Sequence, residues 1–322
     1  MKKHWPILLG LVLAAAGCTF RVDILGESKL QEVLLVKSPA SEKVLVVDVE
    51  GMISSLEPGG IFNREGDVLS QVYARLQRAG EDALVRGIIL RLDTPGGDAT
   101  SSDILYREVL RFKKRTGLPV VALMMGVAAS GGYYVASACD AIIAHPTTIT
   151  GSIGVISLFP DIEGLLSKVG VKVQVIKSGE LKDAGSPFRN LSEQEQRLFQ
   201  EVIDELYERF LEVVHEKRKG LLTLEEIRDM ADGRVYTASQ ALKLKLIDEV
   251  GYFDEALARV LSLAKIASAK VVAYSYYPKR QSNLYASRLE KSSLFDEKSI
   301  TDSLPQLRSG FYYLWLPQMK TD

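Results

Sequence analysis

The chain has 322 residues, of which 47% are hydrophobic and 25% are charged. This composition allows one large core or two modest ones, and it is unlike that of a disordered or fibrous protein. Forty basic residues stand against 41 acidic ones, so the formal net charge is -1. Without a global positive field, nucleic acid is not an expected partner.

The N-terminus has the layout of an export signal. Lys2 and Lys3 form a positive start, the apolar run from Ile7 to Ala16 follows, and small residues come next. A membrane-spanning helix needs roughly 20 apolar residues, and this run has about half that length. We therefore expect residues 1–17 to be a cleaved signal peptide.

The signal ends in Ala15-Ala-Gly-Cys18, which resembles the lipobox of bacterial lipoproteins, although Ala15 stands where leucine is usual. In such proteins the cysteine is diacylated and becomes the new N-terminus, and two acyl chains give stable anchoring. The alternative is that Cys18 is a small residue near an ordinary signal-peptidase site. An exported chain with two cysteines favours lipidation of Cys18. Because Thr19 does not resemble the aspartate retention signal, we expect an anchor facing the periplasm, with the outer membrane favoured over the inner.

After a polar leader (residues 18–42), strand and helix patterns alternate along the chain. Short β-branched runs predict buried strands, and apolar residues at helical spacing predict helices between them. The expected elements are strands at 44–49, 87–92, 119–124, 141–144 and 171–176, and helices at 65–79, 102–112 and 129–138. This alternation indicates an α/β domain built on a mostly parallel sheet.

From Ser192 the pattern becomes mainly helical. Ser192 and Glu195 fit a capping box that starts a long charged helix ending near Lys219, which suggests a packing or assembly element. Further helices are expected at 223–231, 238–245 and 253–264, and a strand at 270–275. We place the folded domain at 43–277 and a partly disordered tail at 278–322. The aromatic cluster 311–316 in that tail could dock on the protein itself, on a neighbouring subunit or at a lipid interface.

Three glycine-bearing segments stand at predicted strand ends, where open α/β sheets place their ligands. In Asp93-Thr-Pro-Gly-Gly-Asp98, two glycines allow backbone N–H groups to face a ligand, as in an oxyanion hole, although a plain tight turn has the same composition. In the second segment, Ser130 is either a helix N-cap or a nucleophile. The third segment, 177–187, carries Lys177 and Lys182, and lysines in loops are usually solvated.

The histidines offer little support for a Ser-His-Asp device. His4 is lost with the signal peptide, His145 precedes Pro146 in a turn, and His215 falls in the long charged helix. A Ser–Lys dyad is the natural replacement. Cys139 lies in an apolar stretch and is expected to be a buried free thiol.

Four ordered motifs together resemble the signal peptide peptidase A (protease IV) family of bacterial serine peptidases. They are Asp93-Thr-Pro-Gly-Gly97, Ala129-Ser-Gly-Gly-Tyr133, Thr150-Gly-Ser-Ile-Gly-Val155 and Lys177-Ser-Gly-Glu-Leu-Lys-Asp183. The resemblance covers about 44–260. Each motif occurs once, so the chain is similar to the short, single-domain members.

The resemblance implies a crotonase-like ββα spiral with an additional helical assembly region. Carried over by position, it makes Ser130 the nucleophile and Lys182 the general base, while Ser152 orients the lysine amine. It also implies an oxyanion hole at Gly97 and Gly131, and a homo-oligomeric ring in which the dyad is shared between subunits. Expected substrates are small or hydrophobic peptides such as signal-peptide remnants, and we expect no cofactor and no metal.

Three other hypotheses use part of the same pattern. A crotonase-fold enzyme acting on coenzyme A thioesters would use the same oxyanion glycines, but export argues against cytosolic substrates. A proteolytically silent envelope scaffold would bind hydrophobic peptides, but Ser130, Ser152 and Lys182 are all intact. A Clp-like Ser-His-Asp peptidase would need a histidine further along the chain than His145.

Overall fold

A computed structural model describes residues 30–55, 67–276, 283–284 and 310–315. The expected signal peptide, the lipidation site Cys18 and most of the expected tail lie outside these residues, so those expectations stay predictions. Within the described part of the chain, no helix is both long and apolar enough to cross a bilayer.

The centre of the molecule is a mostly parallel sheet, as the alternation of strands and helices predicts. Its strand order is β1-β11-β2-β3-β5-β6-β10, and β7 joins β5 to β9 at one end. Only the β1–β11 and β7–β9 pairs are antiparallel. The strands are β1 Gln31–Val36, β2 Lys43–Glu50, β3 Val85–Thr94, β5 Val120–Ala129, β6 Ala141–Ala144, β7 Ile149–Gly151, β9 Val235–Thr237, β10 Glu249–Val250 and β11 Lys270–Ser275.

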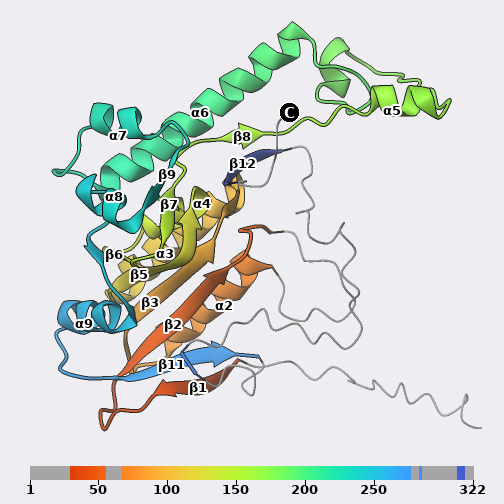
Figure 1. Cartoon of the computed structure of the whole chain (residues 1–322). Helices are drawn as coiled ribbons and strands as arrows, with labels where there is room; N and C mark the ends of the chain where they lie inside the picture. Colours follow the sequence, from red (N-terminus) through yellow and green to blue (C-terminus); the bar gives the residue numbers. More distant parts are fainter. Residues whose placement is uncertain (1–29, 56–66, 277–282, 285–309, 316–322) are drawn as a thin grey trace, which may run out of the picture.

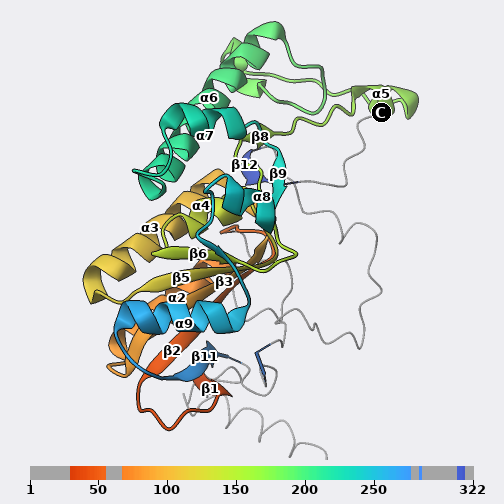
Figure 2. The same ribbon diagram turned by 60° about the vertical axis from the view of Figure 1, so that its left-hand side comes forward.

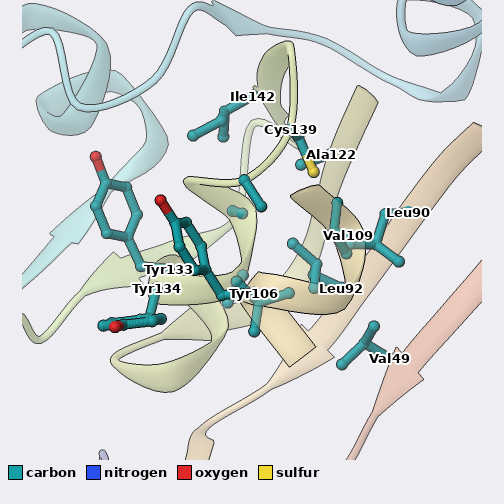
Figure 3. Close-up of a cluster of buried hydrophobic side chains, with 14 of the residues drawn as sticks. Val49, Leu90, Leu92, Tyr106, Val109, Ala122, Tyr133, Tyr134, Cys139 and Ile142 are labelled. Carbon is teal, nitrogen blue, oxygen red and sulfur yellow. The ribbon is translucent and has the colours of Figure 1, made fainter. Parts of the chain in front are cut away.

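Helices cover both faces of this sheet, which explains why its central strands are apolar on both sides (Figures 1 and 2). Alternate β2 residues divide between two cores: Leu45 packs with α2 and α3 residues, and Val44 packs with α9 residues. Part of the first core, with Tyr106, Tyr134 and Leu90, is drawn in Figure 3. The helices are α2 Val68–Glu81, α3 Ala99–Thr116, α4 Gly131–Ala136, α5 Glu163–Lys168, η1 Glu180–Asp183, α6 Glu193–Lys217, α7 Leu224–Met230, α8 Ala238–Lys243 and α9 Phe253–Ala264.

A smaller antiparallel sheet lies beside the first and joins three segments that are far apart in the sequence. Its order is β4 Gly96–Asp98, β12 Phe311–Leu314 and β8 Ile156–Ser157. The aromatic cluster therefore docks on the protein itself, the first of the three expected possibilities. Both views place β12 at the end of the large sheet, close to β8 (Figures 1 and 2).

The predicted strand at 171–176 is wrong: the segment has no regular structure and is exposed. Its alternating valines, Val171, Val173 and Val175, fit a strand, but a strand needs a neighbouring edge to satisfy its backbone N–H and C=O groups. The opposite difference occurs at 31–36, which falls in the expected polar leader but pairs with β11 as β1. In both segments, whether a strand forms depends on whether a neighbouring strand edge is available for pairing.

The segment from 158 to 192, which we call the arm, stands at the N-terminal end of α6 and includes α5 and η1 (Figure 1). The expected capping box of α6 is confirmed, because Ser192 accepts a hydrogen bond from the Glu195 N–H while the Glu195 side chain accepts one from the Ser192 N–H. Much of the arm is exposed, including Leu165, Val169 and Ile176. The arm therefore presents an unusual amount of apolar surface to its surroundings.

The first core makes a testable contribution to stability. Leu90 is fully buried in β3, so Leu90→Ala should lower the free energy of unfolding by about 2–5 kcal/mol, from lost burial and a residual cavity. Leu165→Ala is the matched control, because Leu165 is 61% exposed and its loss should change stability by less than about 0.5 kcal/mol. Urea unfolding followed by circular dichroism measures both, and equal effects would contradict the assignment of Leu90 to the core.

Candidate active site

Two of the predicted site serines lie side by side at the ends of neighbouring parallel strands. Strands β5 and β7 pair Ala129 with Gly151, so Ser130 and Ser152 leave the sheet together. The Ser130 N–H also donates a hydrogen bond to the Gly151 carbonyl oxygen at 2.7 Å. This is the edge at which open α/β sheets gather functional side chains.

Ser130 occupies a sharp turn between β5 and α4, and its backbone is in an unusual conformation. Its φ is 51° and its ψ is -113°, a combination that costs free energy for a residue with a Cβ. Although Ser130 stands at the N-cap position of α4, its side chain makes no capping hydrogen bond. Its Oγ is buried and has no hydrogen-bond partner among the described residues. Capping therefore does not explain this serine.

Ser152 has the same kind of backbone strain and faces a cavity. Its φ is 50°, and its N–H donates to the Arg234 carbonyl oxygen at 2.8 Å. The residue helps to line a cavity of about 480 Å³, together with Asp204, Tyr207 and Trp315 among others. A polar group that entered this cavity could reach the Ser152 hydroxyl.

Gly97 and Gly131 bring two backbone N–H groups to one place, as expected for an oxyanion hole. A Cβ built on Gly131 would lie 3.1 Å from the Gly97 nitrogen and 2.5 Å from Ser102 Oγ. A Cβ on Gly97 would overlap the carbonyl of Ile53. Both glycines are therefore required by the close approach of backbone segments.

Ser102 is a feature of the site that the sequence motifs did not single out. It lies in the first turns of α3, is fully buried, and its Oγ has no hydrogen-bond partner among the described residues. Its hydroxyl faces the same space as the Gly97 nitrogen. Only its position five residues after Gly97 could have drawn attention to it.

Strand β12 covers this space. It pairs Tyr313 with Gly97 and Leu314 with Gly96, and the Trp315 N–H donates to the Pro95 carbonyl oxygen at 2.9 Å. On its other edge, Phe311 pairs with Ser157 of β8. The aromatic cluster in the sequence suggested that this segment docks on a surface, but nothing in the cluster indicated that it would pair with β4 and β8.

The structure does not bring Lys182 to the two serines. Lys182 lies in η1 of the arm, is exposed, and its Nζ has no hydrogen bond or ion pair with any described residue. Both views show the arm apart from the ends of β5 and β7 (Figures 1 and 2). Within one chain, therefore, the expected nucleophile and the expected base are separated.

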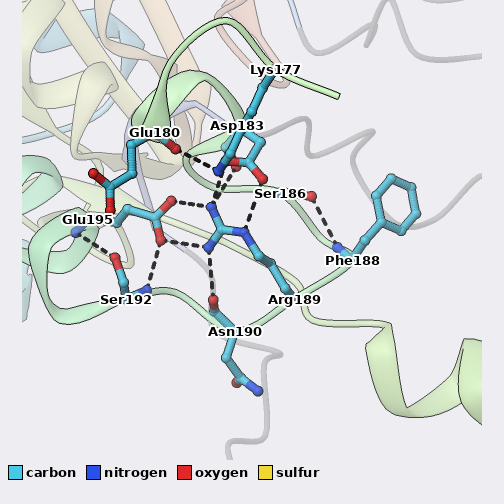
Figure 4. Close-up of polar contacts among 9 residues, drawn as sticks. All are labelled: Lys177, Glu180, Asp183, Ser186, Phe188, Arg189, Asn190, Ser192 and Glu195. Carbon is cyan, nitrogen blue, oxygen red and sulfur yellow. Dashed lines mark hydrogen bonds and ion pairs between the residues drawn. The ribbon is translucent and has the colours of Figure 1, made fainter. Parts of the chain in front are cut away.

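The part of the arm that carries Lys182 has a fixed shape, because charged groups tie it to the start of α6 (Figure 4). Arg189 bridges Asp183 at 2.9 Å and Glu195 at 2.6 Å, and Lys177 contacts Asp183 at 2.7 Å. The hydrogen bonds from Arg189 lower the pKa of Glu195 from 4.5 to about 2, and those from Arg189 and Lys177 also lower the pKa of Asp183. Lys177 thus has a structural partner, whereas Lys182 projects freely.

Neither His145 nor Cys139 is placed to act in a competing nucleophilic site. The His145 ring bonds Thr147 at 2.8 Å and packs against Tyr252, which fits the expected role in a turn. Cys139 is a buried free thiol, as expected, and burial raises its pKa to about 12. A thiol with this pKa is protonated and unreactive at neutral pH.

The carboxylates that hold the arm predict its response to acid. Because the pKa of Glu195 is lowered in the folded protein, its pairing stabilises the arm fully above pH 4.5 and is lost as the pH falls towards about 2. Hydrogen exchange at pH 6 and pH 3, corrected for intrinsic rates, should show the protection of 177–195 falling more than that of α3. Arg189→Gln should show weak protection at both pH values. Unchanged protection of the wild-type arm at pH 3 would contradict this account.

Comparisons with known proteins identify relatives of this chain among peptidases. The profile of Peptidase family S49 matches residues 112–267, a range that includes Ser130, Ser152 and Lys182. A protein named putative signal peptide peptidase SppA from Enterococcus faecium is 34% identical over 249 residues, which is 77% of this chain and 72% of that protein.

Two further relatives extend the match. Putative protease MJ0651 of Methanocaldococcus jannaschii is 33% identical over 284 residues, covering 85% of this chain and 87% of that protein. Protease 4 of Haemophilus influenzae is 38% identical over 215 residues, covering 67% of this chain but only 34% of that longer protein. With a strained, buried serine at the end of β5 and these matches over most of its length, the chain belongs to peptidase family S49, among the serine peptidases named signal peptide peptidase SppA and protease 4.

Proposed function

We propose that the chain is a serine endopeptidase in which Ser130 is the nucleophile and Lys182, from a neighbouring subunit, is the general base. The observation that carries the proposal is Ser130 itself: its hydroxyl is buried without a hydrogen-bond partner in the described part of the chain, on a strained turn beside the Gly97 and Gly131 N–H groups. Strain maintained at a site without a structural use is typical of catalytic groups.

The proposed reaction begins with the substrate carbonyl oxygen at the N–H groups of Gly97 and Gly131. Ser130 Oγ attacks the carbonyl carbon while its proton passes to the neutral amine of Lys182, and the two N–H groups stabilise the negative oxygen that forms. The C–N bond then breaks, and the lysine returns the proton to the leaving amine. Water, deprotonated by the same lysine, hydrolyses the acyl-enzyme. The Ser152 hydroxyl would form a hydrogen bond with the Lys182 amine and thereby orient the amine.

Two features of the arm support a base supplied by a second copy of the chain. Its outer segment exposes Val171, Val173 and Val175 in strand-like alternation, and no strand of the described residues pairs with it, so a second copy of the chain could supply burial and backbone partners. Lys182 stands next to Asp183, which the ion pairs with Lys177 and Arg189 hold in place, and its amine has no partner among the described residues. We therefore infer a homo-oligomeric ring with the dyad shared between neighbours, on a crotonase-like spiral fold.

We further propose that the substrates are small or hydrophobic peptides, such as remnants of signal peptides, and that a lipid on Cys18 holds the enzyme to an envelope membrane on its periplasmic side. The relatives named signal peptide peptidase support the substrate class, and the lipobox-like sequence supports the anchor. We retain the outer membrane as the favoured location.

The small antiparallel sheet favours a peptide over an acyl thioester as ligand. A peptide in extended form can pair its backbone with β4 and β8, as β12 does, whereas a coenzyme A thioester has no such backbone. A silent peptide-binding scaffold would show the same pairing, so the scaffold is separated from the enzyme only by chemistry at Ser130.

A fluorophosphonate probe provides that separation. The wild-type protein should be labelled at Ser130, Ser130→Ala should not be labelled, and Lys182→Ala should be labelled much more slowly, because a hydroxyl without its base is a weak nucleophile. Lys168→Ala is the matched control, since it removes an exposed arm lysine outside the 171–175 segment and should label like wild type. Mass spectrometry locates the adduct. Absence of labelling in every protein would favour the scaffold.

Mixing two inactive variants tests whether the dyad is shared. Ser130→Ala and Lys182→Ala chains, combined under conditions that exchange subunits, should regain peptidase activity, because an intact serine of one chain then meets an intact lysine of another. Activity is measured with a fluorogenic peptide before and after exchange. If the mixture stays as inactive as its parts while exchange is confirmed by mass, the dyad does not cross the interface.

The oxyanion hole can be closed by a single methyl group. The φ of Gly131 is not positive, so alanine fits its backbone angle, but the methyl of Gly131→Ala would lie 3.1 Å from the Gly97 nitrogen and 2.5 Å from Ser102 Oγ, which must rotate away. We expect kcat to fall by at least about a hundredfold, the usual effect of losing an oxyanion donor. Gly164→Ala, which meets nothing within 4 Å, serves as the control. Wild-type kcat in a folded Gly131→Ala protein would exclude this position of the oxyanion hole.

A further inference from the structure

We propose that the Ser102 hydroxyl is a further catalytic group, a third hydrogen-bond donor to the negative oxygen that forms when Ser130 attacks a substrate carbonyl. This inference rests on the proposed function and adds one residue to its oxyanion hole. Three observations carry it: the Ser102 Oγ is buried without a partner, it makes no bond within its own helix, and it lies against the glycines of the hole.

The first observation is a buried hydroxyl without an acceptor. Within the described ranges, two buried side-chain oxygen atoms lack a hydrogen-bond partner, and they are Ser102 Oγ and Ser130 Oγ. Ser102 is 0% exposed, so its hydroxyl is shielded from bulk water. A buried hydroxyl without a partner lowers stability, because it has given up its hydrogen bonds to water. A ligand that supplies the acceptor explains why such a group is kept.

The helix that carries Ser102 does not use its hydroxyl. Serine and threonine side chains within helices commonly donate to the carbonyl oxygen four residues earlier, as Thr116 Oγ1 does to Phe112 at 2.8 Å in α3 itself. Ser102, the fourth residue of α3, makes no such bond with any described residue. The N-terminus of α3 is capped by Asp98, whose side chain accepts a hydrogen bond from the Ser101 N–H at 2.7 Å. Neither capping nor bonding within the helix therefore accounts for Ser102.

The Ser102 hydroxyl lies at the two glycines that provide the other donors. A Cβ on Gly131 would lie 2.5 Å from Ser102 Oγ and 3.1 Å from the Gly97 nitrogen, so the hydroxyl and this nitrogen border the same small space. Ser102 and Gly97 also belong to one continuous segment, because β4 leads directly into α3. The Asp98 N–H holds this junction by donating to the Ile53 carbonyl oxygen at 3.0 Å. The donors are thus fixed before a substrate binds, which makes an oxyanion hole effective.

The proposed role follows the electrons of the first step. As the bond from Ser130 Oγ to the carbonyl carbon forms, the π electrons of the carbonyl move to its oxygen, which becomes negative. The N–H groups of Gly97 and Gly131 and the O–H of Ser102 donate to this oxygen, and the Ser102 proton stays on Ser102 throughout. A hydrogen bond to a charged acceptor is stronger than one to a neutral carbonyl, so the hydroxyl stabilises the transition state more than the bound substrate. Its loss should therefore lower kcat rather than raise KM.

Removal of the hydroxyl tests this role. In Ser102→Ala, kcat for a fluorogenic peptide should fall by about a hundredfold, the usual effect of losing one oxyanion donor, while KM changes by less than about threefold. The midpoint of urea unfolding should stay the same or rise, because the hydroxyl makes no stabilising bond. Ser101→Ala is the matched control, since it changes the adjacent buried serine of α3 and should keep the kcat of wild type. A lower urea midpoint for Ser102→Ala would reveal a structural role and overturn the inference.

Fluorophosphonate labelling separates this inference from the proposed function. The phosphonyl oxygen of the probe takes the place of the oxyanion, so Ser130 should be labelled at least about tenfold more slowly in Ser102→Ala than in wild type. If Ser130 is labelled equally fast in both proteins, Ser102 is not a donor, while the proposed function stands. If Ser130 is labelled in no protein, the proposed function itself fails.

A crystal structure of the wild-type adduct tests the contact without any variant. The phosphonyl oxygen at the N–H groups of Gly97 and Gly131 should lie about 2.5–3.0 Å from Ser102 Oγ, the distance of an O–H···O hydrogen bond. A separation above about 3.5 Å, or a Ser102 hydroxyl that donates to another acceptor in the adduct, would exclude Ser102 from the oxyanion hole.

Discussion

The site depends on one constraint: three backbone segments approach so closely that side chains are excluded between them. At Gly97 and Gly131 the neighbours are the Ile53 carbonyl, Ser102 and the Tyr313 carbonyl. The segment that carries Ser130 and Gly131 is fixed by the hydrogen bond that the Ser130 N–H donates to the Gly151 carbonyl oxygen, and this bond holds Ser130 in its strained turn. Because packed β-strands and helices hold these segments on both faces of the sheet, two N–H donors and a hydroxyl are in place before any ligand arrives.

In the proposed mechanism, the chain divides its chemistry between the packed sheet and the projecting arm. The sheet, with cores on both faces, supplies the serine, the glycines and Ser152. The arm would supply Lys182, next to the ion pairs that Asp183 makes with Lys177 and Arg189. In the proposed ring each subunit completes the active site of the next. The valines of the arm would make the contact between subunits, and the same contact would bring the lysine to the neighbour's serine. Assembly and catalysis then depend on the same contacts.

Much of this fold follows from the sequence, because strands β2, β3, β5 and β6 are apolar runs whose neighbours come next along the chain. The motifs likewise indicated Ser130, Ser152, Gly97 and Gly131, which the structure gathers at one sheet edge. Prediction failed at Val171–Val175, where alternation fits a strand but no described strand provides an edge. It also could not locate β12, whose partners β4 and β8 are more than 150 residues earlier. Ser102 carried no motif, and only burial beside Gly131 distinguishes it.

The exposed valines of the arm have a consequence for where the enzyme works. If each site is completed by a second copy, activity rises steeply with local protein density, and a solitary newly made chain cannot cut its neighbours or itself. Tethering to a membrane would confine the chains to two dimensions and favour their encounter. Dilution into open solution would have the reverse effect. Such a peptidase becomes competent only where copies of the chain accumulate.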